Sequence, residues 1–281
     1  MRSAVVALLA LACGAPAERA PEPEPPRPAG QPRRQELVRL TLLADVNRVA
    51  PGQEVTVAAR FDIAPGWHIY WSNPGESGLA TEAAFRAPAG FRIGPVRFPG
   101  PARFDAPGDI TSYGYEELAV LSAVAAAPDQ LAGDRVQFSV QASWLACRDV
   151  CVPGRGEAAI ELDAARAGEP SEPAHRELFA RHADALPRPL SELAAAPAWR
   201  RDERQVAVTI EVPGARRLEY FPPTPEDMGL IGQASVPARG DMRIELSYKP
   251  SIRPVRLGGV LAVTAGARVR YYAVDLTEPL R

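Results

Sequence analysis

Hydrophobic and polar positions alternate with a period of two over several stretches of the first half of the chain. Such alternation is typical of β-strands that have one face on a core and the other in water. The apolar positions are Val38, Leu40, Leu42, Ala44 and Val46; Val55, Val57, Ala59, Phe61 and Ile63; and Val136, Phe138, Val140, Ala142 and Trp144. Turn signals such as Ala50-Pro51-Gly52 and Ala64-Pro65-Gly66 separate them. Short strands with regular turn residues predict an antiparallel β-sandwich.

The pattern changes near Gly168-Glu169-Pro170, where the strand period stops. Residues 174–186 place Leu178, Phe179, His182 and Leu186 near one side of a helix, and residues 190–196 predict a second short helix. The strand period returns beyond Trp199, in residues 206–212, 244–248 and 268–276. The chain is therefore predicted to be mainly all-β. Two β-domains, residues 36–165 and 199–281, are joined by a short helical connector, residues 166–198.

The first residues predict export. A short apolar run, residues 4–12, follows Met1-Arg2 and is far below the ~20 residues that span a bilayer, so residues 1–12 are predicted to be a signal peptide. Its end resembles a bacterial lipoprotein signal, in which Cys13 would become the lipidated first residue. An ordinary secretory signal is the alternative. The Pro-rich residues 13–35 lack an apolar period and predict a disordered tether to a membrane.

Composition and charge narrow the classes of function. The 32 basic and 34 acidic residues give a formal net charge of −2, which argues against a nucleic-acid binder held by bulk charge. The 30 prolines disfavour a helical bundle and suit short strands joined by rigid loops.

Two cysteines, Cys147 and Cys151, lie where one predicted strand ends and the next begins, so we expect them at the tip of a β-hairpin, within reach of a disulfide. Three interpretations stay open. The pair is a structural staple, a soft Cu(I) site completed by His68, or a site of thiol–disulfide exchange. For exchange, Arg148 would favour the Cys147 thiolate, whereas Asp149 would oppose it or accept its proton.

The densest aromatic stretch, residues 66–75, contains Trp67, His68 and Tyr70. It is interpreted as a core strand, or as an apolar wall beside the cysteines that keeps water and stray thiols away. Residues 104–115 lack a strand period and are predicted to form a loop, either a plain surface turn or a lid.

Several motifs in the same order carry a resemblance to a known family. They are residues 66–82 (GWHIYWSNPGESGLATE), Phe98-Pro99-Gly100-Pro101, Ser112-Tyr113-Gly114-Tyr115-Glu116 and residues 144–153 (WLACRDVCVP). Together they resemble the N-terminal periplasmic domain of DsbD-type thiol–disulfide interchange proteins, and in particular the ScsB branch, which is associated with copper stress.

The resemblance implies an immunoglobulin-like fold for the first domain, and more weakly for the second, with Cys147 and Cys151 as a redox pair. Trp67, His68, Tyr70, Arg148 and Asp149 would surround the pair, and residues 109–113, with Tyr113, would form a cap loop. A thioredoxin-like or membrane electron donor would reduce the pair. The pair would then reduce periplasmic oxidoreductases or isomerases.

The sequence therefore predicts a membrane-tethered periplasmic module that passes reducing equivalents through Cys147 and Cys151 to client disulfides. This function needs no cofactor, no bound metal and no nucleic acid. The alternative is a copper-binding or partner-docking β-sandwich without redox turnover. Because the chain ends at Arg281, we expect separate proteins to supply the electrons.

Overall fold

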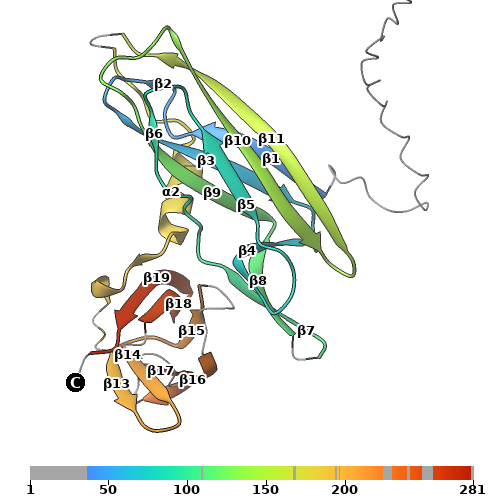
Figure 1. Cartoon of the computed structure of the whole chain (residues 1–281), viewed down its shortest axis with the longest axis vertical. Coiled ribbons are helices and arrows are strands. Elements are labelled where there is room, and N and C mark those ends of the chain that lie inside the picture. The colour runs from blue at the N-terminus through green and yellow to red at the C-terminus, as the bar shows by residue number, and fades with distance from the viewer. Residues whose placement is uncertain are drawn as a thin grey trace, which may run out of the picture. The chain divides into compact units, whose positions relative to one another are not determined.

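The computed structural model describes residues 37–108, 110–166, 169–193, 195, 197–223, 230–238, 241–248 and 256–279 (Figure 1). The predicted signal peptide, Cys13, the tether and Asp109 lie outside these residues. Within the described ranges, no helix combines the length and the apolarity that would let it cross a membrane.

Two sheets form the first β-sandwich. One has the strand order β1-β3-β9-β6, with β1 (Val38–Ala44), β3 (Glu54–Ile63), β9 (Leu118–Ala126) and β6 (Arg92–Ile93). The other has the order β2-β11-β10-β4-β8-β7, with β2 (Arg48–Val49), β11 (Cys151–Ala164), β10 (Arg135–Cys147), β4 (His68–Gly75), β8 (Ile110–Glu116) and β7 (Ala102–Ala106); β5 (Glu82–Arg86) also pairs with β10. All these pairs are antiparallel except β2 with β11.

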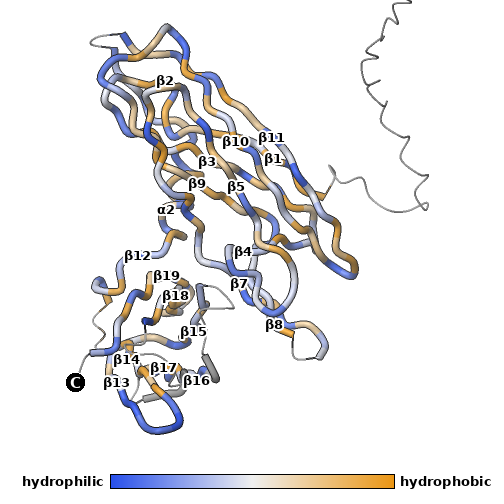
Figure 2. The backbone as a smooth tube through the Cα atoms, in the orientation of Figure 1, coloured by the Kyte–Doolittle hydropathy of each residue, from blue (hydrophilic) through white to orange (hydrophobic). Residues whose placement is uncertain are grey.

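The predicted alternation gives this sandwich its core. Along β10, Val136, Phe138 and Val140 are buried, whereas Arg135, Gln137 and Gln141 are exposed. The alternation of hydrophobic and hydrophilic colours along the strands is visible in Figure 2. Inward-facing side chains of both sheets form one apolar cluster, in which Phe61 and Trp144 meet edge to face with ring centroids 5.6 Å apart. The three strands predicted from the pattern are confirmed.

Two further sheets follow in the second half of the chain. One has the order β12-β19-β18-β15, with β12 (Arg188–Pro189), β19 (Arg268–Thr277), β18 (Arg256–Ala265) and β15 (Arg217–Phe221). The other has the order β13-β14-β17-β16, with β13 (Ala198–Arg201), β14 (Val206–Val212), β17 (Asp241–Tyr248) and β16 (Leu230–Ala238). A second apolar cluster, which includes Val208, Leu218 and Leu261, lies between them. The predicted fold class is confirmed: a mainly all-β chain of immunoglobulin-like sandwich architecture. The domain boundaries at 165 and 199 stay a prediction.

Two local predictions need correction. Of the described residues among 190–196, Leu190–Glu192 form a single 3-10 turn, η1, while Leu193 is already extended. Residues 104–115 were expected to be a loop, but β7 and β8 pair antiparallel there from Ala102↔Gly114 to Ala106↔Ile110. The sequence signal was weak because Gly, Asp and Pro interrupt two short strands.

Buried contacts connect the two halves within residues 33–281, which form one compact unit. Phe221 meets Trp71 and Tyr113 edge to face, with ring centroids 6.3 and 5.2 Å away. Asn73 Nδ2 donates a buried hydrogen bond of 2.8 Å to the Pro222 carbonyl oxygen. The strand that begins at His68 is therefore held at its far end by the second half of the chain.

The helix α2 (Arg176–Ala185) confirms the helix predicted at residues 174–186, with a difference of two residues at the start and one at the end. His182 is its buried residue, and Nε2 lies 2.7 Å from the Ser122 hydroxyl on β9. Burial, aided by the nearby Arg97 charge, lowers the pKa of His182 from 6.5 to about 4. The folded protein therefore holds this imidazole neutral.

Neutral His182 makes the free energy of unfolding depend on pH. Between pH 6.5 and about 4, the unfolded chain binds a proton that the folded chain does not, so stability falls as the pH falls through this window. His182→Gln keeps a hydrogen-bonding side chain but does not titrate. In this variant we expect the free energy of unfolding to lack the acid-induced decrease, which in the original protein is about 3 kcal/mol at most. Chemical unfolding of both proteins at several pH values measures this. Equal pH dependence in the two proteins would contradict the assignment.

Candidate redox site

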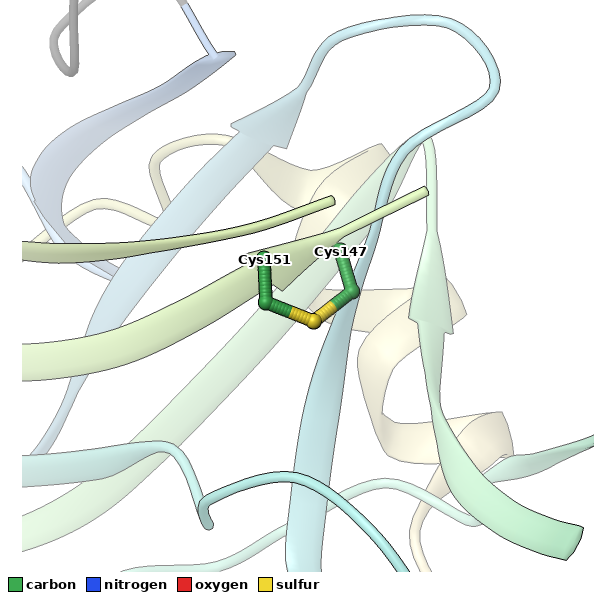
Figure 3. The surroundings of a disulfide bond; sticks show 2 residues. All are labelled: Cys147 and Cys151. Atoms are coloured by element: carbon green, nitrogen blue, oxygen red, sulfur yellow. A yellow bond between two sulfur atoms is a disulfide. The ribbon is translucent and has the colours of Figure 1, made fainter. Parts of the chain in front are cut away.

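The cysteines lie at the tip of the hairpin formed by β10 and β11. The two strands pair from Arg135↔Asp163 to Cys147↔Cys151, and the Arg148 N–H donates to the Val150 carbonyl oxygen across the turn, at 3.1 Å. Cys147 and Cys151 form a disulfide, with their Cα atoms 4.1 Å apart (Figure 3). Directly opposite residues of an antiparallel pair have Cα atoms only about 4.5–5.5 Å apart, so the register itself brings the two sulfur-bearing residues together. The predicted hairpin tip is confirmed.

The two ends of this disulfide differ in exposure. Cys147 is 2% exposed, whereas Cys151 is exposed. Cys147 follows Ala146, which faces the core, so strand alternation directs Cys147 to the outer face of the sheet. Its burial there shows that other residues cover the outer face at this point. A reagent from solution therefore reaches the bond through Cys151.

Four residues form a row across the outer face of the sheet. Cys147 on β10 pairs with Cys151 on β11 and with His68 on β4, and His68 pairs with Glu116 on β8. Directly opposite residues of antiparallel strands project to the same face, with Cβ atoms about 4.5–5.5 Å apart. His68 is therefore the neighbour of Cys147 on the side away from the disulfide. This row is called the Cys–His row below.

Aromatic rings hold the imidazole of His68 in place. The Phe104 ring stacks on it, with centroids 4.7 Å apart and an interplanar angle of 18°, and Tyr70 meets it edge to face at 5.1 Å. Nε2 of His68 is buried and has no hydrogen-bond partner among the residues that the structure describes. Burial lowers the pKa of His68, and the nearby Glu116 carboxylate opposes this effect. An unpaired buried polar atom costs about 1–3 kcal/mol, so this nitrogen is a candidate for a role that the disulfide form does not use.

Tyr70, two residues after His68, is buried although it shares the outer face. The segment after β4 covers it: a Cβ atom on Gly78, whose φ is +96°, would lie 2.3 Å from the Tyr70 ring. Burial raises the pKa of the Tyr70 hydroxyl, and a hydrogen bond with Ser77 opposes this. Glycine is therefore required at position 78 both for its backbone conformation and for the close approach of the ring.

The charged residues of the turn pair with each other. Arg148 Nε donates to Asp149 Oδ2 at 3.0 Å, and its guanidinium lies 5.2 Å from the centroid of the Trp67 ring. Both side chains are largely exposed, so the ion pair contributes little to stability. The expected effects of Arg148 and Asp149 on the Cys147 thiol stay predictions.

Two of the expected surrounding residues lie on the other side of the sheet. Trp67 and Tyr113 belong to the core cluster, and Tyr113 contacts Phe221. Trp67 approaches the turn through Arg148, whereas the structure does not bring Tyr113 to the cysteines. Phe104, which stacks on His68, was missed by the sequence analysis. The apolar Phe104 between Arg103 and Asp105, just before Pro107-Gly108, was the available signal for a short strand.

A metal site was the second interpretation of the cysteine pair. Among the residues that the structure describes, no group of three or more His, Cys, Asp or Glu side chains is arranged to hold a metal ion.

Comparison with known proteins identifies the first sandwich. Residues 39–162 match the family model described as "Thiol:disulfide interchange protein DsbD, N-terminal". This segment is a DsbD-type N-terminal domain. The match includes every residue of the Cys–His row, so the disulfide lies within the DsbD-type domain. The family resemblance seen in the sequence is confirmed.

A solved structure of a periplasmic domain shares the fold of the chain. The N-terminal periplasmic domain of ScsB from Proteus mirabilis is 17% identical, with 85% of this chain and 93% of that chain covered and a TM-score of 0.59. The N-terminal domain of Neisseria meningitidis DsbD in the reduced form is 16% identical, with 51% of this chain and 94% of that chain covered and a TM-score of 0.29. No curated protein matches the sequence significantly.

The difference in exposure predicts unequal reactivity of the two thiols. After reduction, we expect iodoacetamide to modify Cys151 before Cys147, because Cys147 is buried. Trypsin cleavage after Arg148 separates the cysteines into residues 136–148 and 149–155, so mass spectrometry reads each one. In unfolded protein, which is the control, both cysteines should be modified at similar rates. Equal modification of both thiols in the folded protein would contradict the observed burial.

Proposed function

We propose that this chain is a periplasmic thiol–disulfide exchange module that passes reducing equivalents through Cys147 and Cys151 to client disulfides. The observation that carries the proposal is a disulfide with one exposed and one buried end in a DsbD-type domain. The ScsB relative, described as a periplasmic domain, supports the location. Attachment to a membrane through Cys13 is part of the proposal.

The exposed end of the bond receives the first attack. A thiolate of a thioredoxin-like partner attacks Cys151 Sγ, the disulfide breaks, and Cys147 leaves as a thiolate that takes up a proton. A second thiol of the partner then displaces Cys151. The partner loses two electrons and becomes a disulfide, while Cys147 and Cys151 become thiols.

Delivery to a client runs in the opposite sense. The Cys151 thiolate attacks a client disulfide, forms a mixed disulfide and releases one client sulfur as a thiolate. Cys147 then attacks Cys151 Sγ. The disulfide of the domain forms again, and the second client sulfur leaves with the electron pair. The position of Cys147, next to Cys151 in the register, suits this intramolecular step because the two sulfurs need no search to meet.

This division of roles predicts which variant traps a partner. In Cys147→Ser the mixed disulfide at Cys151 has no resolving thiol and should accumulate. In Cys151→Ser the remaining thiol of the pair, Cys147, is buried and should trap much less. Each full-length variant is incubated with an oxidised extract of exported proteins and purified again. Non-reducing electrophoresis then measures the amount of mixed disulfide that each variant has formed.

The double variant Cys147→Ser/Cys151→Ser is the control, because any adduct it forms comes from Cys13. If neither single variant forms more adduct than this control, the exchange function is wrong and the domain acts without redox turnover.

A further inference from the structure

We infer that His68 is the catalytic proton acceptor for the Cys147 thiol when the reduced pair closes again to a disulfide. The inference rests on the proposed function and adds a residue to it. The Cys–His row places His68 directly opposite Cys147 and on the same face.

The burial of Cys147 makes a local proton acceptor necessary. Only the thiolate attacks a disulfide, and an apolar environment disfavours the thiolate. With 2% of Cys147 exposed, bulk water has little access to take its proton. The neighbouring imidazole is the titratable side chain that the register brings next to it.

The unpartnered Nε2 of His68 fits this role. In the disulfide form neither sulfur carries a proton, so the imidazole opposite Cys147 in the register has nothing to accept from it. Once the pair is reduced, Cys147 carries an S–H donor on the same face. Reduction would therefore supply the hydrogen-bond donor that His68 Nε2 lacks in the disulfide form.

Both the ring contacts of His68 and the charged groups around it suit a proton acceptor. Phe104 on β7 and Tyr70 on β4 contact the ring and limit its rotation. The titratable groups around it are Cys147 on β10, Tyr70 on its own strand and Glu116 on β8. Burial lowers the pKa of the imidazole and so favours the neutral form that can accept a proton, while the exposed Glu116 carboxylate opposes this shift and favours the imidazolium after transfer.

Asp149 suits the role less well. Its side chain is 83% exposed and accepts a hydrogen bond from Arg148. A carboxylate that lies in solvent and is already paired with Arg148 is poorly placed to take a proton from a buried thiol.

The step balances as follows. The Cys147 S–H proton moves to His68 Nε2, and Cys147 Sγ attacks Cys151 Sγ of the mixed disulfide with a client protein. The Cys147–Cys151 bond forms, the Cys151–client bond breaks, and the client sulfur leaves with the electron pair. The proton then passes from the imidazolium through solvent beside Glu116 to the client thiolate.

The test measures the pKa of Cys147 by the ultraviolet absorbance of its thiolate in purified Cys151→Ser protein, with Cys13→Ser present in every protein compared so that Cys13 does not absorb. Adding His68→Gln should raise this pKa by about 1 unit, because the imidazolium partner of the thiolate is lost. The matched control is His68→Gln in Cys147→Ser, where the exposed Cys151 thiol should shift much less. An unchanged Cys147 pKa would overturn the inference.

A second measurement needs no change at position 68. Titration of the imidazole by nuclear magnetic resonance should give a higher His68 pKa in Cys151→Ser, where Cys147 can ionise, than in the disulfide form. Equal values would overturn the inference even if His68→Gln fails to fold. Because partner trapping depends on Cys151 and not on His68, trapping that succeeds while these titrations fail would leave the proposed function intact.

Discussion

The antiparallel register of β10 with β11 is the constraint on which the site depends. Thirteen residues of β10 pair without interruption, and the last pair is Cys147 with Cys151. A shift by one residue would turn Cys147 to the inner face, expose Trp144 and Ala146 on the outer face, and separate Cys147 from its partner. The apolar side chains of β10 fix this register because they can be buried on one face only.

The same alternation places the structural residues on the inner face of the sheet and the residues of the redox site on its outer face. The inner face of the sheet carries Trp67, Trp71 and Trp144, which belong to the core. The outer face carries Cys147, His68 and Tyr70, and Phe104 from β7 stacks on His68. A sheet whose inner face is densely packed provides a rigid support for a reactive group on its outer face. The asymmetry between Cys147 and Cys151 follows, since the covered sulfur lies within the sheet and the open one at its edge.

Much of this could be predicted from the sequence. The alternation of hydrophobic and polar positions located β1, β3 and β10. The hairpin tip was located by the two cysteines, because Cys147 ends one predicted strand and Cys151 begins the next. His68 was expected beside the cysteines, but its direct pairing with Cys147 could not be predicted, because β4 and β10 are distant in sequence and their register depends on the whole sheet. Phe104 was missed for the same reason: β7 is recognisable only once it pairs with β8. Tyr113 was assigned to the site from a motif, but the alternation of its strand directs it to the core.

The reduction potential of the Cys147–Cys151 bond tests the central claim most directly. Equilibration of the purified chain with thiol–disulfide buffers of known potential, followed by quantification of both redox forms, gives the value. An exchanging pair with an exposed sulfur should have a potential above about −300 mV. A potential well below that value would mean a bond that partner thiols cannot open, and would contradict the account.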